Sequence, residues 1–131
     1  MNKQFLMIAA ILGALAVIAG AFFAHQLKAK MPERALEIYD TAVRYQFYHV
    51  FALLAAGLLT ERYQGSWMNR AGICFIAGIV LFSGSLYFIS ALMTAGSAIP
   101  VALGILTPLG GLGFILGWIL LAVAVWKGRS A

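Results

Sequence analysis

Long apolar runs alternate with short polar segments along this chain. Residues 5–24 form a run of twenty residues without a charged or strongly polar side chain. An α-helix of that length is about 30 Å long, which is the thickness of the hydrocarbon core of a bilayer. Further spans are predicted at residues 41–60, 71–92 and 109–126. The pattern predicts an all-α polytopic membrane protein, a four-transmembrane-helix bundle that forms one membrane domain over residues 1–131.

The segment between the first two spans is polar and charged. Pro32 suits the first turn of a helix, and the residues after it keep helical spacing. Leu36, Tyr39, Val43 and Phe47 recur on one side. This spacing predicts a short amphipathic helix that lies at the membrane interface and runs into the second span.

The second half of the chain has no charged residue from position 71 to position 126, which is too long for one helix. Helix-breaking residues interrupt it at Gly96, Pro100, Gly104, Pro108, Gly110 and Gly111. The apolar character of residues 94–107 is unusual for a loop exposed to water. We expect this segment either to re-enter the membrane or to lie against the bundle, because lipid does not tolerate irregular backbone.

Composition supports a membrane environment. Apolar residues make up 63% of the 131 residues and charged residues 10%, and so short a chain has too much surface to hide that fraction from water. The partner that follows is the lipid bilayer. The net charge of +5 comes from Lys and Arg between apolar runs, where they anchor loops near headgroups, so it indicates no nucleic-acid partner. Cys74 lies in an apolar run and is interpreted as a packing residue.

The two ends of the chain bear on orientation. Lys3 before the first run and Ala19-Gly20-Ala21 near its end also resemble a cleaved signal peptide, but the run is longer than the apolar region of such peptides. With four spans, one side carries Lys3, Arg62, Arg70, Lys127 and Arg129. The other side carries Lys28, Lys30, Arg34 and Arg44. The excess and the uncharged third loop predict that both termini are cytoplasmic.

Small residues predict where the helices approach one another. Membrane helices have no hydrophobic drive to associate, so small side chains that permit close packing matter. The positions predicted to pack helices are Gly13, Gly20, Gly84, Gly113 and Gly117. Packing within one bundle explains them, and a seam between copies or with another protein is the alternative. A homo-oligomer or a larger membrane-protein complex is therefore a possible assembly.

Ionisable and hydroxyl side chains at membrane depth are the candidates for a site. The first group comprises His25, Asp40, Arg44, Gln46 and His49. The second comprises the hydroxyls of Ser83, Ser85, Tyr87 and Thr107. One interpretation is a proton relay, a ligand site or a headgroup site, and the other is an interfacial Asp40–Arg44 ion pair with histidines and hydroxyls bonded inside the protein. No metal, catalytic or phosphate-binding motif is present, and no cofactor is predicted.

Four ordered motifs resemble a known family. They are Gly20-Ala21-Phe22-Phe23-Ala24-His25, Tyr45-Gln46-Phe47-Tyr48-His49, Leu81-Phe82-Ser83-Gly84-Ser85-Leu86-Tyr87, and Thr107-Pro108-Leu109-Gly110-Gly111 with Gly117-Trp118. The chain is similar over nearly its whole length to the YgdD/YwdK-like small bacterial inner-membrane proteins, a domain-of-unknown-function family. The resemblance implies four spans in the bacterial cytoplasmic membrane and no activity. Its motif residues include Tyr45 and most of the candidate site, whereas Phe23 replaces a family glycine.

Three functions fit these observations. A non-enzymatic accessory or assembly subunit, or scaffold, of a membrane complex is the first, because the chain is small and lacks catalytic motifs. A small proton-linked transporter or channel that uses His25 and His49 is the second. The third is a protein that binds lipid or a small molecule in a zone near the membrane interface, formed by His25, Asp40, Arg44, Gln46 and His49.

Overall fold

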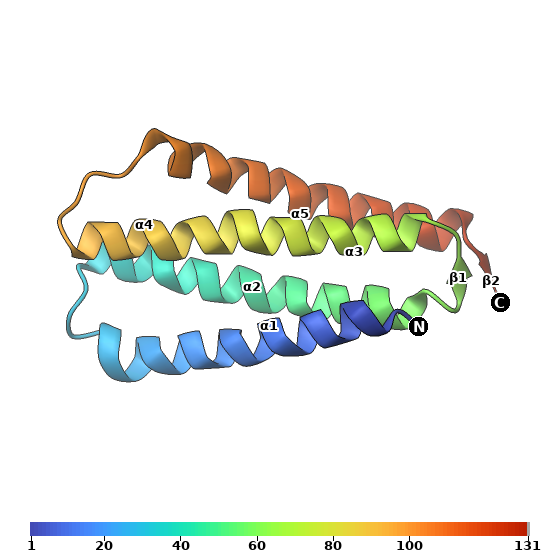
Figure 1. Ribbon diagram of the computed structural model, residues 1–131, viewed down its shortest axis with the longest axis horizontal. Helices are drawn as coiled ribbons and strands as arrows, with labels where there is room; N and C mark the ends of the chain where they lie inside the picture. Colours follow the sequence, from blue (N-terminus) through green and yellow to red (C-terminus); the bar gives the residue numbers. More distant parts are fainter. Residues whose placement is uncertain (131) are drawn as a thin grey trace.

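Four long helical segments run side by side in the computed structural model (Figure 1). The structure describes residues 1–130, and for Arg129 and Ser130 it describes the backbone alone. They are α1 (Lys3–Phe22) with the π-helical η1 (Phe23–Leu27), α2 (Glu33–Leu59), α3 (Trp67–Gly78) with the π-helical η2 (Ile79–Ser83) and α4 (Gly84–Thr94), and α5 (Val101–Lys127). All four segments are long and apolar enough to cross a membrane. The chain is an all-α polytopic membrane protein.

Each helical segment packs mainly against the next one in space. α1 lies against α2, α2 lies against α3 and α4, and α3 lies against α5, so that α1 and α5 are outermost (Figure 1). Both termini lie at one end, where the short strands β1 (Tyr63–Gln64) and β2 (Arg129–Ser130) pair antiparallel. At the same end, a hydrogen bond and the charge of the Met1 amino group, 2.6 Å away, lower the pKa of the Glu61 carboxyl.

Proline and glycine set three helix boundaries. Pro32 and Pro100 immediately precede α2 and α5, where a missing N–H costs nothing because the first turn leaves it unbonded. Gly96 follows α4 with a φ of +70°, and the Ser97 N–H donates to the Leu92 carbonyl 3.0 Å away. This left-handed turn ends the helix and satisfies a terminal carbonyl.

The predicted amphipathic helix is the beginning of α2. The segment after Pro32 is helical without interruption to Leu59 and contains no residue that would break it before Gly57. The amphipathic segment and the second span are therefore one helix, which begins eight residues before the predicted span at Thr41.

Residues 94–107 are mostly helical rather than irregular, and at Thr107 the segment packs against α4. Only residues 95–100 are non-helical, and α5 begins at Val101 and continues through Gly104 and Pro108. In lipid, an unbonded backbone group costs several kcal/mol, so a helix that carries proline is more stable there than an irregular loop. The Thr107 hydroxyl also donates to the Leu103 carbonyl, 3.3 Å away, beside the bond that Pro108 removes.

Aromatic rings pack onto glycines in the core. The ring of Phe5 lies on Gly72, that of Phe75 on Gly117 and that of Phe114 on Gly78. The predicted packing glycines behave differently from one another. A Cβ added at Gly117 would lie 2.6 Å from Phe75, which is too close without movement. A Cβ added at the next three would make near or ordinary contact, 3.4 Å from Val50 at Gly13, 3.5 Å from Gly78 at Gly113 and 3.7 Å from Val43 at Gly20. A Cβ added at Gly84 would meet no atom within 4 Å. Gly84 therefore packs no helix within the described chain.

Candidate functional site

Gln46 joins three of the four segments. Its side chain is buried in α2, its Nε2 donates to the Leu12 carbonyl of α1 (2.8 Å), and its Oε1 accepts from the Tyr87 hydroxyl of α4 (2.7 Å). Both ends of the amide are therefore used between helices. Such bonds hold membrane helices together where the hydrophobic effect between helices is absent.

His49 joins α2 to α5 and has no free ring nitrogen. Its Nε2 lies 3.1 Å from the indole Nε1 of Trp118, and its Nδ1 lies 2.7 Å from the Tyr45 carbonyl. An indole N–H can only donate, so Nε2 accepts and the proton resides on Nδ1, which donates to the carbonyl. The ring is stacked on Phe114 with centroids 3.5 Å apart. Protonation of Nε2 would break the bond to Trp118.

The hydroxyl track also bonds inside the protein. Ser83 donates to the Ala42 carbonyl of α2 at 2.8 Å, and the Ser85 and Thr107 hydroxyls lie 2.6 Å apart between α4 and α5. Each hydroxyl has a single hydrogen, so Ser85 donates to Thr107 when Thr107 donates to the Leu103 carbonyl. When Ser85 donates instead to the Phe82 carbonyl, 2.9 Å away, Thr107 donates to Ser85. No buried side-chain nitrogen or oxygen in the described residues lacks a partner. These side chains are placed to stabilise the bundle.

The structure separates His25 from this network. His25 is exposed in η1, whereas α2 contacts α1 further inside, where the Tyr39 hydroxyl donates to the Ala19 carbonyl (2.9 Å). Tyr39 and Trp118 were not among the predicted site residues, although both carry interhelical bonds. In the sequence, they can be identified as aromatic residues with a hydroxyl or indole N–H donor that lie within or beside an apolar run.

Asp40 and Arg44 point away from the bundle. Arg44 Nε lies 3.1 Å from Asp40 Oδ2, and the side chains are 55% and 46% exposed. The buried side of α2 carries Ala42, Gln46, His49 and Leu53. The opposite side carries what we call the α2 outer face, which consists of Glu37, Asp40, Arg44, Tyr48 and Phe51.

The ion pair of the outer face lies level with uncharged stretches of the neighbouring helices. The two residues before Arg44 contact the neighbouring helices. Val43 lies against Gly20 of α1, and the Ala42 carbonyl accepts the hydrogen bond from Ser83. Gly20 and Ser83 both lie within the uncharged runs of their own spans. Ser83 follows Arg70 by 13 residues (83 − 70), which is about 20 Å along a helix. The ion pair therefore lies beside uncharged stretches of both neighbouring helices, and the described residues leave about half of each charged side chain exposed.

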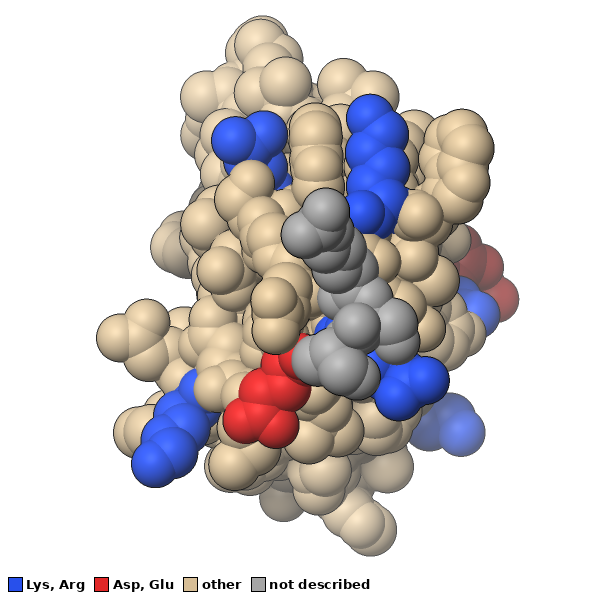
Figure 2. Space-filling model, turned by 90° about the vertical axis from the view of Figure 1, so that its right-hand side faces the viewer, with Lys and Arg blue, Asp and Glu red and all other residues tan. Residues whose placement is uncertain are grey.

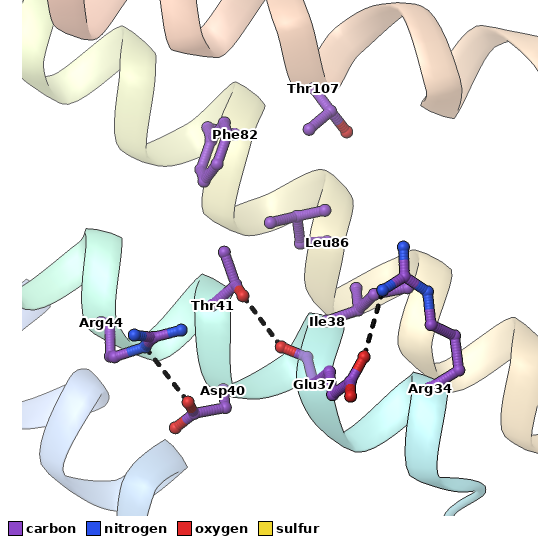
Figure 3. A pocket seen from close by; sticks show the side chains of 9 residues that line it. All are labelled: Arg34, Glu37, Ile38, Asp40, Thr41, Arg44, Phe82, Leu86 and Thr107. Atoms are coloured by element: carbon purple, nitrogen blue, oxygen red, sulfur yellow. Dashed lines mark hydrogen bonds and ion pairs between the residues drawn. The ribbon is translucent and has the colours of Figure 1, made fainter.

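A cavity of about 480 Å³ lies beside these charges (Figure 3). Side chains from α2 line most of it, Phe82 and Leu86 line it from the third segment, and Thr107 lines it from α5. Arg34 and Glu37 form a second ion pair at its rim, with 3.1 Å between Nη1 and Oε2. With Asp40 and Arg44 the lining carries two positive and two negative charges.

These features define a class: a four-span membrane protein whose polar motif residues bond between helices and whose second helix carries an exposed ion pair. The family described as "Protein of unknown function (DUF423)" matches residues 19–111. The chain belongs to this family, which confirms the resemblance noted in its motifs.

Relatives along nearly the whole chain are membrane proteins by name. The UPF0382 membrane protein YwdK of Bacillus subtilis is 41% identical over 126 residues, covering 95% of this chain and 98% of the relative. The UPF0382 membrane protein SERP0230 of Staphylococcus epidermidis is 38% identical, covering 95% and 97%. A UPF0382 membrane protein of Haemophilus influenzae is 37% identical over 130 residues, covering 99% of each chain. No solved structure matches significantly.

Proposed function

We propose that this chain is a non-enzymatic accessory or assembly subunit of a membrane complex, situated in the bacterial cytoplasmic (inner) membrane. The observation that supports this function is the α2 outer face. An ionised side chain near the centre of a membrane helix costs about 2.5–3.5 kcal/mol on insertion scales. The Asp40–Arg44 pair offsets part of this cost, but both side chains remain about half exposed. A second polypeptide helix laid on this face removes the pair from lipid.

The internal bonds favour a structural role over catalysis or proton transfer. A nucleophile needs an adjacent base, but the Ser83 hydroxyl donates to a backbone carbonyl and His49 is bonded at both nitrogens. A relay needs a histidine that can take up a proton, and uptake at His49 Nε2 would place two donors opposite each other. A lipid held at the ion pair is the remaining alternative, and the following experiment distinguishes it.

A photo-reactive phenylalanine analogue at Tyr48 tests this function in membranes of the native host. Tyr48 is 52% exposed on the outer face, and Met7 of α1, 64% exposed, provides the matched control position. We expect a protein adduct from position 48 that disappears when Arg44→Leu is added, and none from position 7. Adducts with lipid alone from position 48 would contradict an accessory role.

The charges favour cytoplasmic termini. Lys and Arg side chains are spread over the face at the terminal end (Figure 2). The basic residues of the segments at this end are Lys3, Arg62, Arg70 and Lys127, and Arg129 follows in the sequence. Of the four basic residues assigned to the other side, Arg44 lies within the span. The count on the terminal side is therefore five against three at the opposite surface, which favours this orientation under the positive-inside rule.

Reporter fusions measure this orientation. We expect green fluorescent protein fused after residue 131 to fluoresce, because it folds in the cytoplasm. Alkaline phosphatase inserted between Ser97 and Ala98 should be active, because that loop lies at the opposite end from the termini. An active phosphatase at the C-terminus together with an inactive one in the loop would show that the termini lie on the opposite side of the membrane.

A further inference from the structure

We propose that the helix covering the α2 outer face is the α2 helix of a second copy of this chain, in a parallel dimer with its twofold axis along the membrane normal. This inference rests on the proposed function, because it names the partner at the same face. Copies inserted by the same route share one orientation, so their α2 helices run parallel. Twofold symmetry is the commonest arrangement of homo-oligomers.

The charges of this face complement a second copy of themselves. Helix side chains lean toward the N-terminus, so the Arg44 guanidinium reaches the level of Asp40, as their 3.1 Å contact records. In a parallel copy, Asp40 lies at that same level. The two arginines and two aspartates then alternate in sign around the axis, and each arginine faces an aspartate on either side.

Each member of the pair has bonding capacity left for a partner. The ion pair uses Nε of Arg44 and Oδ2 of Asp40. In the described part of the chain, the two terminal nitrogens of the guanidinium and Oδ1 of Asp40 contact no other polar group. A guanidinium donates five hydrogens in a planar fork, so Arg44 can bond its own Asp40 and that of the copy together.

The rest of the outer face provides apolar contact area in continuity with the charges. Tyr48, Phe51 and Leu58 are 52%, 62% and 57% exposed and extend the face toward the terminal end. Leu58 lies on the same side of α2 and follows Glu37 by 21 residues (58 − 37), about 32 Å, so this side of the helix is long enough to span the hydrocarbon core. A copy placed there buries both its charges and its rings.

A charge swap separates dimerisation from folding. In the double variant Asp40→Arg/Arg44→Asp, each chain keeps an i, i+4 ion pair of reversed order. Two differently tagged chains are co-expressed, solubilised in mild detergent and pulled down through one tag. Wild type should retain wild type, and the swapped chain should retain the swapped chain. The mixed pair should be recovered about tenfold less, because like charges then face each other.

A disulfide test fixes the register of the contact. In a Cys74→Ala background, Tyr48→Cys should form an oxidised dimer in membranes, whereas Met7→Cys on α1 should not. Equal recovery of the mixed and matched pairs would overturn the proposed dimer. Loss of self-association together with a Tyr48 adduct to a different protein would overturn the second copy and leave the accessory function intact. Labelling of lipid alone would overturn both.

Discussion

Replacing Gly110 by alanine is expected to lower the free energy of unfolding by about 3 kcal/mol, which corresponds to about 10 °C in Tm. A Cβ at Gly110 would lie against the backbone nitrogen of Phe82 and within 2.8 Å of the Leu81 carbonyl carbon. Both atoms belong to the helical backbone of η2, so neither can rotate away as a flexible side chain would. The added methyl group must therefore push α5 away from the third segment.

Gly104→Ala is the matched control on the same helix. A Cβ at Gly104 would meet no atom within 4 Å, and alanine favours the helix more than glycine does. Its Tm should be unchanged or slightly raised. Thermal unfolding of both variants in one detergent measures the difference. If Gly110→Ala unfolded at the same temperature as Gly104→Ala, the close approach of α5 to η2 would be wrong.

Gln46→Leu is expected to destabilise the bundle by about 2 kcal/mol. The change removes the bond to the Leu12 carbonyl and the bond from the Tyr87 hydroxyl. Interhelical hydrogen bonds in membrane proteins contribute about 0.6 kcal/mol on average and up to about 1.7 kcal/mol. Two such bonds, together with the unpaired Tyr87 hydroxyl that remains, account for the estimate.

Hydrogen exchange locates the effect of Gln46→Leu. Because Gln46 joins α1 to the rest of the bundle, amides of α1 should exchange faster in the variant, while those of α5 should change little. Gln26→Leu is the control, since Gln26 is exposed in η1. Equal protection of α1 in both variants would indicate that the amide bridge does not hold this helix.

The spans could be predicted from the sequence because long uncharged runs have few folded alternatives. The error at residues 101–108 has a physical cause. Gly104 and Pro108 are helix breakers in water, where a loop can bond to solvent, but in lipid the helix remains the only way to satisfy most of the backbone. The pattern after Pro32 predicts a helix that runs into the second span, and the structure confirms this as the single helix α2.

The first group of candidate site residues does not stay together in the structure. Gln46 and His49 face inward, whereas Asp40 and Arg44 face outward on the same helix. Both sides of this half of α2 carry polar residues, so hydrophobic periodicity does not fix how the helix is rotated. The partners are also backbone carbonyls, such as those of Leu12 and Ala42, which no sequence motif encodes.

The polar motif residues hold the helices together through hydrogen bonds to one another and to backbone carbonyls of neighbouring helices. The most direct measurement is a double-mutant cycle of unfolding free energies on Gln46→Leu and Tyr87→Phe, the pair joined at 2.7 Å. Tyr48→Phe replaces Tyr87→Phe in the control cycle. We predict a coupling free energy of about 1 kcal/mol for Gln46 with Tyr87 and about zero for Gln46 with Tyr48. Additive effects of Gln46→Leu and Tyr87→Phe would contradict the account.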